Sequence, residues 1–381
     1  LFGAGLSKPV DGAAAEAIRV CAEADMSVLA VDLPSGVSGE SGEVLGAAFR
    51  ARITVTFARK KPGHLLEPGR SLCGEIVLAD IGISDAVIAQ VAPTAFENGP
   101  ALWGEAFPRP AVDAHKYSRG HVGVFSGGLS ATGAARLSAM ASARIGAGAV
   151  TMLSPGNAIA ANAAHLTSII LRKTDSMEDV QEFLEQRKPA ALVFGPGLGP
   201  HPKVGRFAID LIAGAKDAPK TIVLDADAIT SLAQQPDDFF AAAGREGAPA
   251  LVITPHTGEF GRLFPDIAAD GKLSKLAKAR AAAKRANATL VFKGPDTVIA
   301  APTGYAAING NGTPLLATAG SGDVLSGMIA GLAAQGMPPF EAACAAVWMH
   351  AEAARRFGPG LIAEDLPLAL LPVLRELVAY E

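Results

Sequence analysis

The sequence predicts an α/β protein whose C-terminal part contains a parallel sheet covered by helices on both faces. Three observations support this prediction. Short, continuous apolar runs recur along the chain, helical patterns lie between most of them, and loops rich in Gly, Asp or Pro follow them. Strands that are apolar along their whole length are buried on both faces, as in parallel sheets between two layers of helices. With 381 residues, the chain is long enough for two domains.

The first domain is expected to span residues 1–91 and to be α/β. A helical pattern covers 13–24, and strand-like runs cover 27–31, 53–57 and 75–80. The first of these runs is followed by Asp32 and by a sharp turn, Pro34-Ser35-Gly36. Three strands are few for a stable sheet, so this region looks like the back part of a larger domain.

Residues 92–112 are predicted to be a linker. They contain four prolines and no clear hydrophobic period. Proline-rich segments without periodicity are typical of the connections between domains.

The second domain is expected to span residues 113–381. Its strand-like runs are 121–125, 149–153, 191–194, 221–224, 250–253, 289–292 and 297–300, and its helical patterns are 131–145, 177–187, 203–214, 273–286, 323–335 and 340–357. Ligands of such sheets bind beyond the carboxyl ends of the strands. The loops after the strands are therefore where we expect the functional site.

Composition excludes several classes of function. The net charge of −4 and the isoelectric point near 6.0 give no general attraction to nucleic acid or to an anionic membrane. No charge-free apolar stretch reaches the length of a membrane span. The three cysteines are widely spaced, which argues against a zinc site and for a reducing, cytoplasmic compartment. The chain begins at Leu1 and not at Met, so we expect its natural N-terminus to lie further upstream.

The most informative segment is Gly320-Ser321-Gly322-Asp323, which precedes an apolar helical pattern. Glycines let the backbone approach a ligand, and a helix N-terminus presents unpaired N–H groups and the positive end of the helix dipole. Together they form an anion pocket suited to phosphate. A carboxylate at Asp323, beside a bound phosphate, is unexpected unless it takes part in chemistry. The alternative is an ordinary glycine-rich turn with an acidic residue in the first helical turn.

Two further loops each allow two interpretations. Gly195, Gly197 and Gly199 form a backbone surface that a flat or phosphorylated ligand could approach, or they serve only a strand-to-helix turn. Asp225 and Asp227 end a strand. They could hold Mg²⁺ through water, or cap the next helix.

His256 and Lys293 also follow strands. A neutral imidazole at His256 could hydrogen-bond a substrate, and Lys293 could reach a phosphate, although both residue types are common in such loops. The sequence has no P-loop, no Gly-x-Ser-x-Gly elbow with a plausible histidine partner and no Gly-x-Gly-x-x-Gly dinucleotide fingerprint.

The order of these loops resembles a known family. Gly320–Asp323 matches the Gly-x-Gly-Asp hallmark of the ribokinase-like fold, and within that fold residues 113–381 resemble the ADP-dependent NAD(P)H-hydrate dehydratases. The matching segments, in family order, are His115-Lys116, Arg119–Val122, Thr132–Leu137, Gly146–Gly148, Phe194–Gly199, Leu224–Ala228, Thr254–Glu259, Lys293-Gly294, Asn309–Gly312 and Ala319–Leu325. The resemblance implies a three-layer α/β/α domain.

The resemblance also implies an activity. NADH or NADPH that has been hydrated at C6 of its nicotinamide loses water and is restored, with ADP as a helper and Mg²⁺ as a cofactor. Asp323 is the implied proton shuttle; because a helix N-terminus favours its ionised form, we expect a base or an orienter of water more than a resting acid. The implied substrate residues are Ala134, Gly197, Gly199, His256 and Asp323. The implied ADP-binding residues are Lys293, Gly294, Pro295, Asp296, Thr297, Asn309, Gly310, Asn311, Gly312, Thr313, Gly320, Ser321 and Gly322.

The first domain resembles the C-terminal part of the NAD(P)H-hydrate epimerases, which implies a partial Rossmann-like fold. The matching segments are Leu1–Ser7 and Val31–Gly36. Asp32 matches the substrate-contacting aspartate of that family, and Ser35 matches a potassium ligand. The front half of the family domain has no counterpart here, so epimerase activity is left open.

Two other functions remain as alternatives. One is a small-molecule kinase of the ribokinase-like fold, such as a vitamin-precursor kinase, which shares the anion loop and the aspartate. The other is a non-catalytic nucleotide-sensing module. As expected partners we name the hydrate substrate, ADP and, because the family tends to assemble, further copies of the chain in a homo-oligomer.

Overall fold

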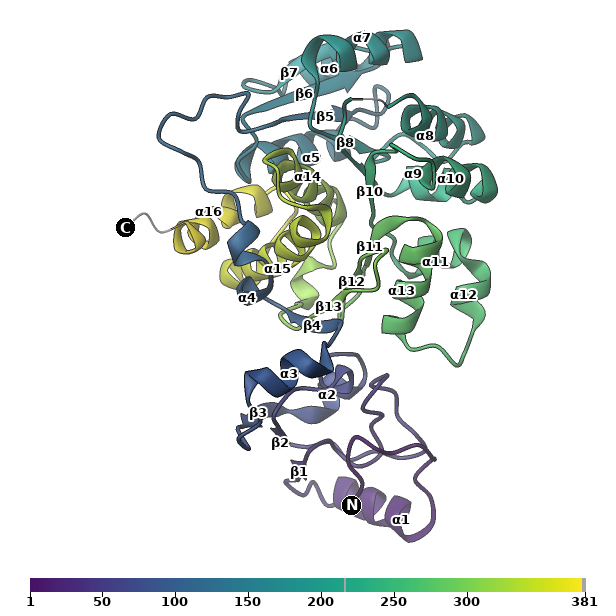
Figure 1. Ribbon diagram of the computed structural model, residues 1–381, viewed down its shortest axis with the longest axis vertical. Helices are drawn as coiled ribbons and strands as arrows, with labels where there is room; N and C mark the ends of the chain where they lie inside the picture. The colour runs from purple at the N-terminus through teal and green to yellow at the C-terminus, as the bar shows by residue number, and fades with distance from the viewer. Residues whose placement is uncertain (216, 379–381) are drawn as a thin grey trace.

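The computed structural model describes residues 1–215 and 217–378, and its larger part is a three-layer α/β/α sandwich (Figure 1). Within these residues the central sheet has ten strands, in the order β4-β13-β12-β11-β10-β9-β8-β5-β6-β7. Their bounds are β4 Ala95–Asn98, β5 His121–Phe125, β6 Ala149–Ser154, β7 Ile170–Lys173, β8 Ala191–Phe194, β9 Thr221–Leu224, β10 Ala250–Ile253, β11 Ala288–Phe292, β12 Val298–Ala300 and β13 Ala306–Asn309. The sheet confirms the predicted fold class.

The sheet departs from the prediction at one edge. All seven strands expected in the second domain form, but β12 pairs antiparallel with both β11 and β13. A short loop, residues 293–297, connects β11 to β12, and so short a connection joins antiparallel strands only. The strands β4, β7 and β13 were not predicted.

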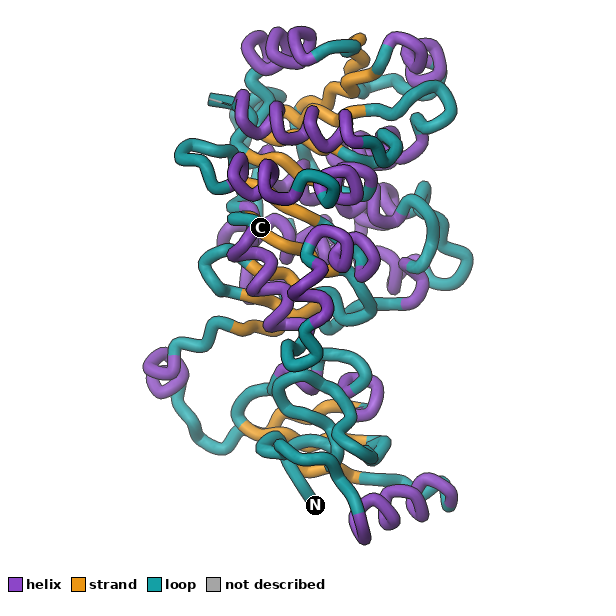
Figure 2. Tube along the Cα trace, turned by 90° about the vertical axis from the view of Figure 1, so that its right-hand side faces the viewer, coloured by secondary structure: helices purple, strands orange, loops and turns teal. Residues whose placement is uncertain are grey.

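Helices cover both faces of the sheet (Figure 2). One layer consists of α5 (Gly133–Arg144), α14 (Ser321–Ala334), α15 (Pro339–Phe357) and α16 (Leu366–Leu377). The other contains α7 (Met177–Arg187), α8 (Pro202–Gly214), α9 (Asp227–Leu232), α10 (Pro236–Ala243), α11 (Thr257–Leu263), α12 (Pro265–Ala269) and α13 (Lys275–Arg285). Strand side chains alternate between the layers: Val122 and Val124 pack with the first layer and Phe125 with the second. A short helix, α6 (Ile159–Ala163), precedes β7.

Close packing of α5 on α14 fixes the start of α14. A Cβ atom at Gly327 would lie 2.1 Å from the carbonyl oxygen of Ser138, so only glycine permits this approach. The hydroxyl of Ser138 donates a hydrogen bond of 2.8 Å to the carbonyl of Asp323, and Ser142 donates one of 2.8 Å to the carbonyl of Gly327. The backbone that carries Asp323 is therefore held by its neighbouring helix.

The front part of the chain forms a smaller α/β unit, drawn below the β4 edge of the large sheet in Figure 1. Its sheet has the order β1-β2-β3, with all pairs parallel, and contains β1 (Leu29–Val31), β2 (Ile53–Phe57) and β3 (Glu75–Ala79). Its helices are α1 (Gly12–Glu23), α2 (Gly69–Cys73) and α3 (Asp85–Val91). Leu33, Val37 and Cys73 form a small buried core.

The range 92–112 is not only a linker. Residues Ala95–Asn98 form β4, which pairs parallel with β13 at the edge of the large sheet. Pro100–Trp103 forms α4, and Trp103 is buried in the core of the second domain. Prolines at both ends of this segment conceal the short strand from a periodicity analysis. The second domain thus begins before residue 113.

Short 3₁₀ turns complete the structure: η1 (Pro62–His64), η2 (Gly104–Ala106), η3 (Gly156–Ala158) and η4 (Pro314–Leu316). Among residues 1–215 and 217–378, no helix combines the length and the apolar character that crossing a membrane requires.

Candidate active site

The glycine-rich loop at the start of α14 lies over the carboxyl ends of β9 and β11. Gly320 caps α14 in the left-handed region, with φ of 89°. A Cβ atom at Gly322 would lie 3.5 Å from Lys293 Nζ, after β11, and 3.8 Å from Asp225 Oδ2, after β9. The structure thus brings together the anion loop, the lysine and the aspartate that the sequence singled out separately.

Lys293 and Asp225 form a buried ion pair beneath this loop. Lys293 Nζ donates to Asp225 Oδ1 at 2.9 Å, and the hydroxyl of Ser326 donates to Oδ2 at 2.6 Å. Asp225 is 1% exposed. Burial alone would raise its pKa, but the charge of Lys293 and the hydrogen bond from Ser326 outweigh burial and lower it. Asp225 is therefore a paired, structural anion.

Among residues 1–215 and 217–378, no lysine or arginine forms an ion pair with Asp323, and burial raises its pKa to about 7. The negative charge of Asp225 raises it further, whereas Lys293 opposes the shift and acts only through its charge. The helix N-terminus favours the ionised form, but burial and a second carboxylate oppose it and have the larger effect on the pKa; the role of Asp323 as a base or an orienter of water stays a prediction. Near neutral pH the group exists in both protonation states and can donate as well as accept a proton.

The predicted substrate loops meet beside this centre. A Cβ atom at Gly197 would lie 2.7 Å from the carbonyl oxygen of Ala131 and 3.5 Å from Ala134 Cβ, so the two loops are in contact. The backbone N–H of Gly199 donates to Asp227 Oδ2 at 2.8 Å. Asp227 therefore holds the glycine loop in place.

His256 is placed at the start of α11. Its Nδ1 accepts a hydrogen bond of 2.9 Å from the N–H of Gly258, while its side chain remains 56% exposed. Its Nε2 lies 3.5 Å from Glu259 Oε1, and Glu259 Oε2 lies 3.9 Å from Lys293 Nζ. Burial raises the pKa of Glu259 despite Lys293. This chain of contacts connects His256 to the ion pair under Asp323.

The predicted nucleotide loops include one contact that the sequence did not indicate. The hydroxyl of Ser321 lies 3.4 Å from Nε2 of His350, a buried residue of α15. Burial lowers the pKa of His350 to about 4, so its imidazole is neutral. His350 lies within an apolar helical pattern, and only the fold brings it to the anion loop.

The loop after β13 is shaped by its own amides. Asn309 Nδ2 donates to Asn311 Oδ1 at 2.8 Å, and Asn311 Nδ2 donates to the carbonyl of Trp348 at 3.0 Å. Thr313 caps η4. These side chains fix the loop, and a role of the backbone around Gly310 and Gly312 in binding ADP stays a prediction.

The loop between β11 and β12 is held in a similar way. Thr297 donates to the carbonyl of Gly294 at 2.8 Å. The carboxylate of Asp296 is buried, pairs with Lys275 and accepts a hydrogen bond of 3.0 Å from the N–H of Glu67 in the front domain. Its carboxylate is therefore engaged within the protein, and a role of Asp296 in ADP binding stays a prediction.

The side chains of the site limit how a metal ion could be held there. In the described parts of the chain, no group of three His, Cys, Asp or Glu side chains could hold a metal ion. Mg²⁺ binds readily through phosphate oxygens and water with few protein ligands. A magnesium ion therefore fits this centre only together with a nucleotide.

The two front-domain residues lie together after β1. Asp32 Oδ1 accepts a hydrogen bond of 2.7 Å from Lys61 Nζ, and Oδ2 accepts one of 2.8 Å from the N–H of Ala4. Burial opposes ionisation of Asp32, but these contacts outweigh it and lower the pKa. The hydroxyl of Ser35 exchanges hydrogen bonds with the backbone of Phe2. Potassium at Ser35 stays a prediction.

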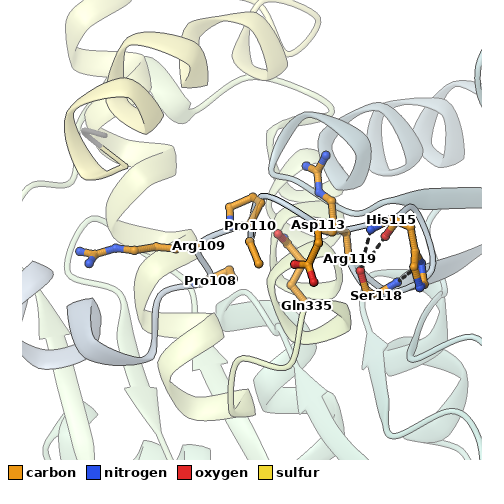
Figure 3. A pocket seen from close by; sticks show the side chains of 10 residues that line it. Pro108, Arg109, Pro110, Asp113, His115, Ser118, Arg119 and Gln335 are labelled. Atoms are coloured by element: carbon orange, nitrogen blue, oxygen red, sulfur yellow. Dashed lines mark hydrogen bonds between the residues drawn. The ribbon is translucent and has the colours of Figure 1, made fainter. Parts of the chain in front are cut away.

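A hollow of about 390 Å³ lies at the ends of the strands opposite to Asp323, beside the start of β5 (Figure 3). It is formed by the segment before β5 and by Gln335, which follows α14. Three polar residues of this segment bond locally: Ser118 and His115 bond each other, and Arg119 Nη2 donates to the carbonyl of Gly146 at 3.0 Å. The length of α14 separates the hollow from Asp323, so the early family motif around His115 supports the fold and not the site.

The ten-stranded sheet between two layers of helices places the protein in the ribokinase-like class. A family profile described as NAD(P)H-hydrate dehydratase matches residues 122–370, and one described as YjeF-related protein N-terminus matches residues 1–63. The chain belongs to the family of bifunctional NAD(P)H-hydrate repair enzymes.

Curated relatives carry that name over nearly the whole chain. The enzyme of Moorella thermoacetica is 37% identical, covering 99% of this chain and 72% of its own length; that of Gloeobacter violaceus is 36% identical, covering 98% and 74%. The chain therefore spans about three quarters of the length of these relatives.

Solved structures agree with the family. The ADP/ATP-dependent NAD(P)H-hydrate dehydratase of Bacillus subtilis, co-crystallised with ATP and Mg²⁺, matches with a TM-score of 0.63 and 25% identity over 74% of this chain and 98% of its own. A hydroxyethylthiazole kinase of Pyrococcus horikoshii matches with a TM-score of 0.50 and 15% identity over 70% of this chain and 93% of its own. The likeness to the kinase shows the shared fold alone. The comparisons therefore favour the dehydratase over the kinase alternative.

Proposed function

We propose that this enzyme restores NADH or NADPH by ADP-dependent loss of water from the hydrated cofactor, with Asp323 as the group that moves the proton. The observation that carries this proposal is the environment of Asp323. It stands at a helix N-terminus suited to phosphate, and its pKa is raised to about 7 beside a fully paired Lys293–Asp225 couple. A carboxyl group poised near neutral pH suits general acid–base catalysis.

The dehydration needs two proton movements. The hydroxyl on C6 of the nicotinamide leaves as water once it receives a proton, and the lone pair of the ring nitrogen assists its departure. The neighbouring carbon, C5, then loses a proton, and the C5–C6 double bond forms. Asp323 in its protonated form donates the first proton, and the resulting carboxylate accepts the second. The group is thereby returned to its starting state.

The remaining residues of the site position the substrate. We assign the hydrated ring to the surface formed by Ala134, Gly197 and Gly199, with His256 at its exposed side. The contact between the Gly197 and Ala131 backbones keeps this surface rigid. Rigid, water-excluding walls favour a reaction in which water must leave and not return.

ADP would occupy the N–H groups of Gly320–Gly322, the Lys293-Gly294 turn and the backbone around Asn309–Thr313. Its phosphates complement the dipole of α14 and would carry Mg²⁺ through their oxygens and water. The negative charge of these phosphates would favour the protonated form of Asp323, which is the form that donates a proton. The Bacillus subtilis enzyme, crystallised with ATP and Mg²⁺, supports a nucleotide and magnesium in this role.

In the front domain we propose that Asp32, held ionised by Lys61, contacts the hydrate during exchange of its two epimers. A kinase would share the fold, the anion loop and the aspartate, but the family matches favour the dehydratase.

The test is to incubate the protein with NADH hydrate and follow the absorbance of restored NADH with ADP, with ATP and with neither. We expect restoration only with a nucleotide. Phosphorylation of another small molecule at the expense of ATP, without restoration, would overturn the proposal in favour of the kinase, and nucleotide binding without any turnover would leave a sensor.

A further inference from the structure

The front domain reaches onto the nucleotide loops through residues 61–70. Leu66 is fully buried and belongs to the hydrophobic core of the second domain, as does Leu65 at 6% exposure. This segment begins at Lys61, the partner of Asp32, and continues through the turn before α2 into the start of that helix. It is therefore anchored in both domains.

One side chain of this segment joins two separate loops. Arg70 Nη1 donates to the carbonyl oxygen of Pro295 at 3.0 Å, and its Nη2 donates to the carbonyl oxygen of Gly312 at 3.1 Å. The two carbonyls belong to the loop after β11 and to the loop after β13. A Cβ atom at Gly312 would lie 2.5 Å from the Pro295 oxygen, so the loops also touch each other. The planar guanidinium spans them in one fixed geometry.

A second contact holds the first of these loops from the same side. The N–H of Glu67 donates to Asp296 Oδ2 at 3.0 Å, while Lys275 of the second domain pairs with Oδ1. Asp296 is 5% exposed. The loop is thus fixed between a lysine of its own domain and the backbone of the front domain.

We propose that Arg70 is a positioning residue for the dehydratase: it holds the two nucleotide loops in their binding arrangement before ADP arrives. The inference rests on the proposed function, since it takes these loops to bind ADP. Loops that are ordered in advance do not lose conformational freedom on binding, so the nucleotide binds more tightly. Arg70 bonds to backbone carbonyls of the two nucleotide loops, so the chemical step at Asp323 should not depend on it.

A comparison limits how strongly we expect Arg70 to affect nucleotide affinity. The Bacillus subtilis dehydratase matches over 98% of its own chain but only 74% of this one. About a quarter of this chain thus has no counterpart in the match to that protein. We therefore expect Arg70 to tune nucleotide affinity and not to be indispensable.

The experiment measures KM for ADP and kcat for NADH-hydrate dehydration in the full chain, with Arg70→Ala, Arg70→Gln and Arg70→Lys. We expect KM for ADP to rise about fivefold in Arg70→Ala, the loss of roughly one net hydrogen bond, with kcat within twofold of the wild type. Arg70→Gln and Arg70→Lys keep a donor that can reach one carbonyl and should fall between. Arg59→Ala removes an exposed ion pair with Asp85 in the same domain and should leave both constants unchanged.

The outcomes separate this inference from the proposed function. If the wild type restores NADH with ADP but Arg70→Ala keeps its KM for ADP, the positioning role is wrong. If kcat falls while KM is unchanged, Arg70 acts on the chemistry and the inference is also wrong. If the wild type shows no ADP-dependent restoration, the proposed function itself fails. Should Arg70→Ala not fold, Arg70→Gln, which retains most of the side-chain packing, decides the matter by the same two constants.

Discussion

Each domain presents one aspartate near the carboxyl ends of its parallel strands. The environments of these two aspartates shift the pKa in opposite directions. Asp32 in the front domain is bonded to Lys61 and to a backbone N–H, and its pKa is lowered. Asp323 in the second domain is half-buried near Asp225, which is already paired with Lys293, and its pKa is raised to about 7. The same residue type is thus an anion in one domain and a titrating acid in the other.

The difference indicates which of the two carboxyl groups is suited to moving protons. A carboxylate that is held ionised by a lysine is suited to orienting a ligand, because giving it a proton means breaking that pair. A carboxyl without a cation of its own changes protonation state readily near neutral pH. The pairing of Lys293 with Asp225, and not with Asp323, is what separates the two cases.

The largest expected effect comes from removing the titrating acid. Asp323→Asn should lower kcat for dehydration by about 10²- to 10⁴-fold, because the amide can neither donate nor accept the proton. Nucleotide affinity should change little. Asp32→Asn is the matched control and should leave the dehydration rate unaltered; equal losses in the two variants would contradict the division of roles.

Removing Lys293 tests the pairing itself. Lys293→Met leaves Asp225 buried without a cation, and we expect unfolding in urea to show a loss of about 3 kcal/mol. Arg285→Met breaks the surface pair with Asp266 and should cost less than about 1 kcal/mol. A loss from Lys293→Met no larger than that of the surface control would mean that the ion pair does not hold the site.

The pH dependence of stability should have opposite signs at the two aspartates. The pKa of Asp323 is raised from an ordinary value of 3.8 to about 7, so between these values the folded protein binds more protons than the unfolded chain, and stability falls as pH rises. Asp323→Asn should therefore gain stability relative to the wild type from pH 4 to pH 8, by on the order of 2 kcal/mol. Measuring urea midpoints across this range checks the trend.

The contribution of Asp32 to stability has the opposite pH dependence. Its pKa is lowered, so its contribution is present at neutral pH and is lost as the pH falls through the pKa of the folded state. Asp32→Asn should be less stable than the wild type at pH 7, with the gap closing in acid. The same sign for both variants would show that the two environments do not differ as described.

The smallest effect is expected from the cation of Asp32. Lys61 and Asp32 have side chains that are 29% and 25% exposed, so solvent screens their attraction. Lys61→Met should cost about 1 kcal/mol and should leave dehydration intact. A large loss of dehydration activity in this variant would show that the two domains are coupled, which contradicts the separate roles assigned to them.

Much of the fold was predictable because apolar strands such as Val122–Phe125 and Val252-Ile253 show their burial directly in sequence. The short edge strand β4 was not, since its four residues lie between prolines and owe their pairing to β13, more than two hundred residues away. The direction of β12 was missed for a related reason: only the brief connection after Phe292 determines it.

For the site, the local motif was enough to locate Asp323 but not to fix its protonation state. The dipole argument used only the helix that carries Asp323. The opposing effects come from burial and from Asp225, about a hundred residues earlier in the chain, which periodicity and motifs do not reveal. His350 and Arg70 were missed likewise, because their contacts with the nucleotide loops exist only after folding.

The most direct test of the central claim is a titration of Asp323 itself. Carbon-13 NMR of the side-chain carboxyl groups in protein labelled at aspartate, with Asp323→Asn used to assign the signal, gives the pKa of this residue alone. We expect a value near 7, well separated from that of Asp32. A value for Asp323 at or below 4 would contradict its role as the proton-carrying acid.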